Sequence, residues 1–511
     1  MNPDFLAFAT AFTMSAVLAP LMAKLARVLG VVDRPDGYRK LHLRAIPLTG
    51  GPTLLISCLI AVCITLWFSP GVIGLSGENR RFLLCLLGAS VLIVIVGLVD
   101  DRFGLRGRQK LFGQIVAASM MLPAGITIDR VTGFGMAIEF GDISSIVTVL
   151  WILGAINALN LIDGVDGLAS TTGIVLSLSV AAVTFVLGGR ADGLMMSLVL
   201  AGSLCGFLIY NFPPARMFLG DSGSMLIGLI LGCVALKCSI KHYTAAAMIM
   251  PMAIWAIPIF DVSMAIVRRK LTGRSIYATD RAHLHHCLMR KGIGGETLLL
   301  VVAALCGLTG IGAVMSAALD NELVAVVGVG TAVAILVLTR SFGHAELSLL
   351  TNRIRRFSST IISFASREKI EIHDDQVRLH GKHQWEELWV TLTEFAERFA
   401  MDGVELMVAV PNVGEEYHAT WKRKSATERH ETWKSEIPLI VDGTRVGQLR
   451  ILGTSCGGPI CEWMAELIAG LRPFETQLVG LIEELQQEHG SFRRRKKMDS
   501  GVFRLQSTAP N

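Results

Sequence analysis

The sequence predicts a polytopic α-helical membrane protein of about eleven transmembrane helices, followed by a small α+β domain. Of its 511 residues, 52% are hydrophobic and only 17% are charged. Residues 1–340 hold 43 charged residues (13%), whereas residues 341–511 hold 46 (27%), close to the value of about 25% that is ordinary for soluble proteins. The first part therefore cannot be a purely soluble enzyme. The net charge of +5 is too small to indicate a nucleic-acid binder.

Eleven apolar runs are long enough to cross about 30 Å of hydrocarbon as helices. Most of the 10 cysteines lie singly among apolar residues, which excludes a secreted disulfide scaffold. The runs lie near residues 5–26, 50–69, 82–99, 112–128, 143–161, 168–188, 194–211, 222–239, 244–267, 297–317 and 322–339.

The loops between these runs form two alternating sets with very different charge. One set, up to Arg340, carries 19 of the 25 Lys and Arg residues of the membrane part, and the other carries 6. The positive-inside rule places the first set in the cytoplasm. We therefore expect the N-terminus outside and the C-terminal domain in the cytoplasm, where unpaired cysteines persist.

Adjacent carboxylates stand at the inner end of the third run, in Gly97-Leu98-Val99-Asp100-Asp101-Arg102. Paired carboxylates repel each other unless a cation or a proton separates them. The pair is consistent with a cation site, and equally with a solvated helix cap.

Amides and carboxylates recur at the inner end of the fifth run. Asn157, Asn160, Asp163 and Asp166 are spaced three or four residues apart, so that a helical end can present them on one face. Two Asp-Gly pairs then end the helix. The alternative is a polar turn between two spans.

A loop with Asn211 and Arg216 leads into the eighth run, which begins Gly220-Asp221-Ser222-Gly223-Ser224. A helix start of this kind offers free backbone N–H groups, hydroxyls and a carboxylate, which suits a phosphate or a metal–phosphate pair. The alternative is an N-cap followed by small residues for helix packing.

A cationic loop follows the ninth run and contains Arg281, His283, His285 and His286. The histidines are candidate metal ligands or, with the arginines, a polyanion site; the many cations favour phosphate. The alternative is a basic stretch that contacts anionic lipid. Asp261 lies about 10 Å inside the membrane on the preceding helix, either as a functional group or as part of an internal hydrogen bond.

Carboxylates, phosphate-binding turns and a cationic histidine loop thus gather on one side of the membrane. This chemistry suits a divalent cation and a diphosphate. Over residues 1–340 the sequence resembles the polyprenyl-phosphate N-acetylhexosamine-1-phosphate transferases, whose superfamily includes phospho-N-acetylmuramoyl-pentapeptide transferase. The resemblance rests on the ordered motifs Arg34-Pro35…Arg39-Lys40…His42…Pro47…Gly50-Gly51, GLVDDR, NALNLIDGVDGLA, NFPPARMFLGDSGS and DRAHLHH.

The resemblance implies that a polyprenyl phosphate attacks the β-phosphorus of a UDP-N-acetylhexosamine, releasing UMP, with Mg²⁺ or Mn²⁺ required. It implies a multi-pass protein of the bacterial inner membrane with a cytoplasmic active site. Asp221 would be the metal ligand. The catalytic residues would be Asp100, Asp101, Asp163, Asp166, His283, His285 and His286. The substrate-binding residues would be Asn157, Asn160, Asn211, Arg216, Phe218, Ser222 and Arg281.

Individual roles follow from the same resemblance. Asp100 and Asp101 would lie beside the lipid phosphate, one of them as its base, and Phe218 would stack on uracil. The spaced His283-Leu284-His285-His286 is more similar to the N-acetylglucosamine branch than to the muropeptide branch. A muropeptide-type transferase and a membrane carrier of a nucleotide sugar or lipid-linked sugar remain the alternatives.

The C-terminal part divides into a connector over 341–372, an α+β accessory domain over 373–487 and a basic tail over 488–511. We expect a helix near 386–402, a strand over Val404–Val410, a hairpin turning at Asp442-Gly443 and a long helix near 460–487. We expect this domain to bind a cytoplasmic regulator, and the sequence allows a homodimer.

Overall fold

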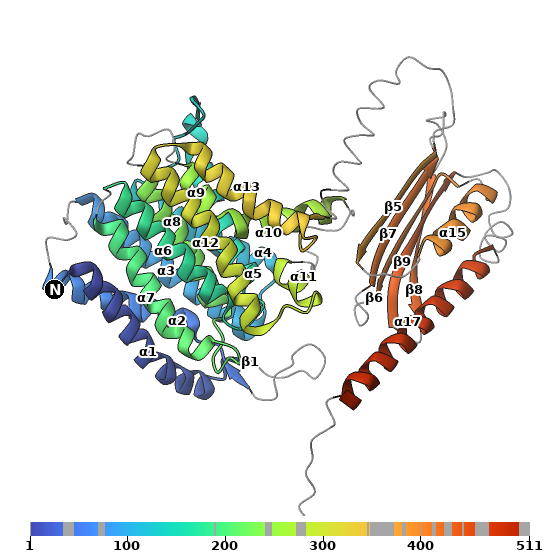
Figure 1. The fold of residues 1–511 in the computed structure, drawn as a ribbon, viewed down its shortest axis with the longest axis horizontal. Coiled ribbons are helices and arrows are strands. Elements are labelled where there is room, and N and C mark those ends of the chain that lie inside the picture. The colour runs from blue at the N-terminus through green and yellow to red at the C-terminus, as the bar shows by residue number, and fades with distance from the viewer. Residues whose placement is uncertain are drawn as a thin grey trace, which may run out of the picture. The chain divides into compact units, whose positions relative to one another are not determined.

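Long apolar helices dominate the first part of the chain in the computed structural model (Figure 1). Eight helices of the described residues are long and apolar enough to cross a membrane, which makes the chain a multi-pass membrane protein. They are α1 (Pro3–Leu29), α2 (Gly50–Phe68), α3 (Gly77–Phe103), α5 (Ser144–Ile162), α6 (Leu168–Val186), α7 (Ala191–Asn211), α8 (Gly220–Ile240) and α12 (Gly295–Leu319).

The structure describes residues 2–33, 45–69, 77–188, 191–240, 248–271, 283–344, 347, 372–380, 385–399, 401–410, 415–423, 432–441, 444–454 and 470–499. The chain divides into two units, Met1–Leu347 and Ser348–Asn511. Most of the predicted connector over 341–372 lies outside the described residues, as do Arg281 and the stretch from Arg34 to His42.

Three of the eleven predicted runs form shorter or broken helices. The run over 112–128 is not one helix, because α4 (Gly107–Ser119) ends and a 3₁₀ turn, η1 (Leu122–Ala124), follows. The run over 244–267 is divided into α9 (Ile249–Ile254) and α10 (Ala256–Leu271). Pro258 has no N–H to donate to Ile254, so the helical ladder is interrupted there. The last run is the 17-residue α13 (Glu322–Leu338).

Close helix contacts around α8 organise the first unit. α8 is the most deeply buried of the eight candidate spans. A Cβ at Gly228 would lie 2.6 Å from the carbonyl oxygen of Ala155 in α5, and one at Gly97 of α3 would lie 2.2 Å from Ser222 Cα. Small residues let helix backbones approach in a membrane, so Gly97 brings the end of α3 against the start of α8 and Gly228 brings α8 against α5.

Short extended segments complete the first unit. β1 (Val32–Asp33) pairs with β2 (Ile46–Pro47), and β3 (Arg130–Gly133) pairs with β4 (Met136–Glu139). Leu48 continues from β2 into a parallel bridge with Phe218, and the Phe218 N–H donates to the Pro47 carbonyl at 3.0 Å. The segment before α2 is thereby tied to the loop that precedes α8. A short helix, α11 (Leu284–Arg290), carries the histidines.

The second unit is α+β, as predicted. A five-stranded antiparallel sheet has the order β5 (Ile372–His380), β7 (Glu415–Arg423), β6 (Gly403–Val410), β9 (Thr444–Thr454) and β8 (Thr432–Val441). The side chains of α15 (Glu386–Arg398) and α17 (Arg472–Asp499) share one hydrophobic core with it. The predicted helix near 386, the strand Val404–Val410 and the paired strands around 442–443 are present; the turn residues lie outside the described residues.

Two strands and one helix end differ from the prediction for this unit. The sequence analysis did not identify β5 and β7, which carry charged residues and histidines between their apolar positions. The last helix continues to Asp499 rather than ending near 487, so the basic run Arg493–Lys497 is helical.

Ion pairs cross the sheet on the side away from its helices. Val404, Leu406 and Val408 of β6 are buried in the hydrophobic core, so the alternating Glu405 faces the other way. Its carboxylate lies 3.1 Å from His418 Nε2 and accepts from Arg450 at 2.6 Å. The His418 hydrogen bond and the Arg450 charge lower the pKa of Glu405. His418 is buried and contacts Glu405 on the neighbouring strand, so its role is structural.

The contact between α3 and α8 can be tested by Gly97→Ala. The added Cβ would meet the backbone of Ser222, and overpacking of this kind costs about 1–3 kcal/mol or more. We expect a fall of several degrees in the apparent Tm of the detergent-solubilised protein. Gly154→Ala is the matched control, because a Cβ there meets nothing within 4 Å. Equal stability of the two variants would contradict the proposed packing.

Candidate active site

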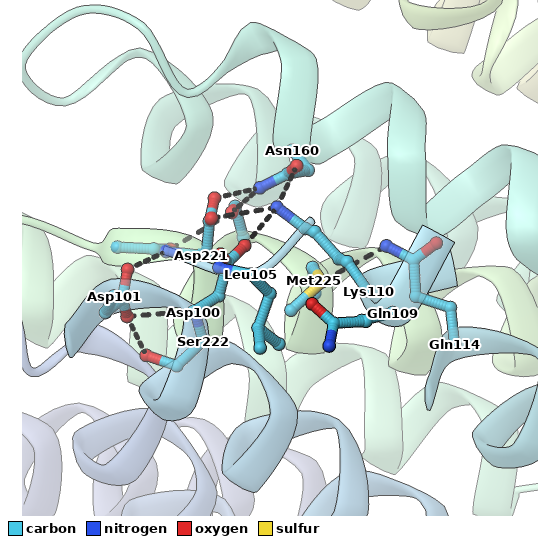
Figure 2. Close-up of polar contacts among 12 residues, drawn as sticks. Asp100, Asp101, Leu105, Gln109, Lys110, Gln114, Asn160, Asp221, Ser222 and Met225 are labelled. Atoms are coloured by element: carbon cyan, nitrogen blue, oxygen red, sulfur yellow. Dashed lines mark hydrogen bonds and ion pairs between the residues drawn. The ribbon is translucent and has the colours of Figure 1, made fainter. Parts of the chain in front are cut away.

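Asp101, at the end of α3, caps the start of α8 (Figure 2). Its carboxylate accepts from the Asp221 N–H at 2.8 Å, the Ser222 N–H at 3.3 Å and the Ser222 hydroxyl at 3.0 Å. Gly220 makes the approach possible: it has φ of 72°, and a Cβ there would lie 2.7 Å from an Asp101 oxygen. A carboxylate at a helix N-terminus is favoured by the free N–H groups and by the helix dipole.

Lys110 of α4 lies at the centre of the site, with its ammonium among oxygen atoms from three other helices (Figure 2). Nζ is 2.8 Å from Asp221 Oδ2, 3.0 Å from Asp100 Oδ2 and 3.0 Å from Asn160 Oδ1. Burial by itself lowers the pKa of Lys110, but the carboxylates of Asp221 and Asp100 outweigh this effect and raise that pKa. The lysine is therefore charged at neutral pH.

The amides of α5 complete this cluster. Asn160 donates to Asp221 Oδ1 at 2.6 Å and to the Ser224 hydroxyl at 3.0 Å. One turn earlier, Asn157 donates to the side chain of Gln114 at 2.9 Å. Asn160 therefore touches the acidic cluster directly, whereas Asn157 connects α5 to α4.

The Asp163–Asp166 turn lies beside the cluster and serves two purposes. Burial and the charges of Asp221 and Asp101 raise the pKa of Asp163 well above its ordinary range. Asp166 instead accepts from the Ala215 N–H at 2.9 Å, so it holds the loop before α8. The carboxylates of Asp163, Asp221 and Asp101 therefore repel one another, and a cation between them would relieve this repulsion.

The residues of the loop before α8 have mostly supporting contacts. Asn211 is buried, accepts from the Ser170 hydroxyl at 2.7 Å and donates to the Met217 carbonyl at 2.9 Å. Arg216 is exposed, and the backbone of Phe218 bonds to the segment before α2. Asn211 was predicted to bind substrate; in this structure its amide is used to shape the loop.

The histidines lie together on the start of α11. His283 Nδ1 is 3.0 Å from Asp261 Oδ2, and the rings of His283 and His285 are stacked with centroids 6.1 Å apart. A Cβ at Gly164 would lie 2.6 Å from His285 Nε2, so this ring touches the Asp163–Asp166 turn. Burial and the neighbouring His286 lower the pKa of His285 to about 4. His285 is therefore a neutral imidazole at pH 7.

The donor set suits Mg²⁺ better than a metal held by the protein alone. No group of three or more His, Cys, Asp and Glu side chains poised to hold a metal ion occurs in the described part of the chain. Mg²⁺ needs only one or two carboxylates and takes its other ligands from water and phosphate. Asp221 and Asp100 share the ammonium of Lys110, and the charges of Asp221 and Asp101 oppose the ionisation of Asp163. A divalent cation among these carboxylates would relieve their repulsion.

Two contact residues were missed in the sequence analysis. Lys110 and Gln114 were not among the predicted site residues. They are four residues apart on α4, so they share a helical face, and that face points at Asn157 and Asn160. A polar stripe on an otherwise apolar helix was the signal that could have identified them.

The fold and the site are those of a multi-pass membrane protein in which carboxylates, an ammonium and a helix N-terminus meet at the ends of apolar helices. Residues 83–239 match the family described as glycosyl transferase family 4. Over 298 residues the chain is 33% identical to a Bacillus subtilis protein named "Probable undecaprenyl-phosphate N-acetylglucosaminyl 1-phosphate transferase", covering 58% of this chain and 80% of that protein.

Two further relatives extend the comparison. The decaprenyl-phosphate N-acetylglucosaminephosphotransferase of Mycobacterium tuberculosis H37Rv is 32% identical over 347 residues, covering 61% of this chain and 84% of the relative. The phospho-N-acetylmuramoyl-pentapeptide-transferase of Desulforudis audaxviator is 31% identical over 343 residues, covering 61% of this chain and 100% of the relative. The chain belongs to this family of polyprenyl-phosphate sugar-phosphate transferases, as its motifs predicted.

Lys110→Met tests the central ion cluster. Removing one partner of a buried ion pair leaves uncompensated charge and is strongly destabilising. We expect transferase activity to fall at least about 100-fold, as when a preorganised donor is removed, together with a lower apparent Tm. Arg27→Gln removes an exposed cation of α1 and should change neither. Wild-type activity in Lys110→Met would refute the arrangement.

His285→Gln tests the neutral histidine. Folded His285 takes up a proton near pH 4, whereas an unfolded histidine does so near pH 6.5. The contribution of neutral His285 to the free energy of unfolding is therefore fully present above pH 6.5 and is lost as the pH falls toward 4. The apparent Tm should decline less between pH 7.5 and 5 in His285→Gln than in the wild type. His344→Gln, which removes an exposed histidine, is the control, and an unchanged decline in His285→Gln would argue against burial of the neutral form.

Proposed function

We propose that this enzyme transfers N-acetylhexosamine 1-phosphate, as N-acetylglucosamine 1-phosphate, from its UDP-sugar to a polyprenyl phosphate and releases UMP. The observation that carries the proposal is the cluster in which Asp100, Asp221, Asn160 and Lys110 meet. Membership of the family and the names of its relatives support the same substrates.

The reaction is an exchange of phosphoanhydride partners. An oxygen of the polyprenyl phosphate forms a bond to the β-phosphorus, and the bond from that phosphorus to the oxygen bridging it to the α-phosphorus breaks. UMP leaves with the bridging oxygen and its electron pair. A phosphate monoester has a second pKa of about 6 and is mostly dianionic at pH 7. Removal of a proton by Asp100 or Asp101 therefore contributes little, and positioning and charge neutralisation dominate.

Asp221, with Asp100 beside it, is the group that would hold Mg²⁺ or Mn²⁺. When bound, the cation would neutralise phosphate oxygens and orient the diphosphate. Asp101 acts differently, since its oxygens are used by the first N–H groups of α8. Its role is to fix the start of α8 and thereby the direction of Asp221.

Lys110 and the histidines would contact the phosphate groups of the substrate in different ways. The Lys110 ammonium lies within 3.0 Å of both metal-site carboxylates, so it can pass from these oxygens to a phosphate oxygen without leaving the site. His285 is neutral and offers a hydrogen bond rather than a charge. Phe218, Arg216 and Arg281 remain proposed contacts to uracil and phosphate.

We place the site on the cytoplasmic side of a bacterial inner membrane, with the N-terminus outside and the C-terminal unit inside. The ratio of 19 to 6 cations between the two loop sets supports this orientation. Eleven spans, a homodimer and a cytoplasmic regulator that binds the α+β unit belong to the same proposal.

The function is tested with purified protein, polyprenyl phosphate, MgCl₂ and a panel of UDP-sugars that includes UDP-GlcNAc, UDP-GalNAc and UDP-MurNAc-pentapeptide. We expect UMP release that needs both lipid and metal, is fastest with UDP-GlcNAc and stops on addition of EDTA. Release with the muropeptide alone would reassign the substrate. Silence with every UDP-sugar would overturn the proposal and favour a carrier.

Asp221→Asn and Asp100→Asn separate the metal site from a base. Asp221→Asn should abolish turnover, with a loss of at least about 1,000-fold. Asp100→Asn should keep a residual activity that rises with pH as the lipid phosphate loses its second proton. Initial rates of UMP release from pH 5.5 to 9 measure both variants.

Asp129→Asn is the control, because Asp129 is an exposed carboxylate outside the site, and it should match the wild type. Complete loss in both site variants at every pH would contradict this division of roles.

A further inference from the structure

A carboxylate of α10 is fully buried and is used entirely by the histidine segment. Asp261 has 0% exposure. One of its oxygens is 3.0 Å from His283 Nδ1, and the other accepts the Leu284 N–H at 2.8 Å. His283 and Leu284 are the first residues of the histidine segment, and they follow Asp261 by 22 and 23 positions along the chain. Asp261 thus joins α10 to the start of α11.

This contact fixes His283 in one orientation. A buried carboxylate without partners is costly, so the Asp261–His283 contact resists separation. The contact turns the Nδ1 edge of the His283 ring toward Asp261. A carboxylate behind an imidazole commonly sets tautomer and orientation in this way.

The fixed ring supports the next histidine. The His283 and His285 rings are nearly parallel, with an interplanar angle of 7°. His285 is 3% exposed, and its Nε2 has no hydrogen-bond partner within the described residues. That nitrogen lies against Gly164, where a side chain would collide with it. Gly164 stands between Asp163 and Asp166. Successive contacts through His283 and His285 therefore connect Asp261 to the acidic turn of the site.

We propose that Asp261 is a positioning residue of the transferase: it acts through His283 to hold His285 against the Gly164 turn. The inference rests on the proposed function. Asp261 itself lies behind the histidines, and it contacts His283 and Leu284 rather than the acidic cluster. It is the membrane-buried acid that the sequence left open between a functional and a purely structural role.

A double-mutant cycle distinguishes these roles. Asp261→Asn has the same shape and keeps an acceptor for the Leu284 N–H, but it no longer holds the His283 proton. We expect kcat/KM for UDP-GlcNAc to fall about 10- to 100-fold, the usual effect of removing a partner that orients an imidazole. If Asp261 acts through His283, then Asp261→Asn combined with His283→Asn should be no slower than His283→Asn alone.

Three controls keep the outcome decisive. Wild-type UMP release tests the proposed function by itself, so an inactive wild type refutes the function and the inference together. Thr309→Val removes a buried hydroxyl that bonds only within its own helix and should leave kcat/KM unchanged. Apparent Tm and size-exclusion profiles report whether each variant folds.

Gly164→Ala approaches the same contacts from the other end and serves if Asp261→Asn does not fold. Its Cβ would displace His285 Nε2, and we expect a comparable loss of kcat/KM without loss of fold. With an active wild type, unchanged kinetics in either folded single variant would overturn the inference while leaving the function intact. Multiplied losses in the double variant would also overturn it, because they would show that Asp261 acts independently of His283.

Discussion

The ammonium of Lys110 lies within 3.0 Å of two carboxylates and one amide oxygen, which belong to α3, α8 and α5. Asp100 and Asp221 share this single positive charge, and without a cation they would repel each other. The positions of the helix ends depend on this balance of charge, because Asp101 at the same time caps α8. We propose that these carboxylates take a divalent ion together with the phosphates of the substrates.

The close approach of the helices makes this balance possible. Gly97 and Gly220 let the end of α3 meet the start of α8 without side chains between them, and the Pro47–Phe218 contact holds the preceding loop from a third direction. The histidines are positioned in a similar way. Gly164 leaves room for His285, and the buried carboxylate of Asp261 contacts His283. Small residues set the distances, and buried carboxylates set the directions.

Asp100, Asp163 and Asp221 could be singled out from the sequence, because a membrane protein has few reasons to place carboxylates at the ends of apolar runs. The sequence could not predict which contacts each would make. Asp166 accepts from the Ala215 N–H and Asn211 accepts from the Ser170 hydroxyl of α6, and these contacts become visible only in the folded chain. Lys110 was missed because its partners are 111 and 50 residues away along the chain. The strands β5 and β7 were missed for a similar reason, because their pairing depends on partners far along the chain.

The central claim is that the phosphate nearest the sugar moves with it onto the lipid at this acidic site. UDP-GlcNAc labelled with ³²P at the β-phosphorus measures this directly when incubated with polyprenyl phosphate, MgCl₂ and the purified enzyme. The account predicts that the label appears in the organic phase, in a lipid diphosphate, and that the UMP released carries none. Label remaining in the aqueous phase as UDP, or no transfer at all, would contradict it.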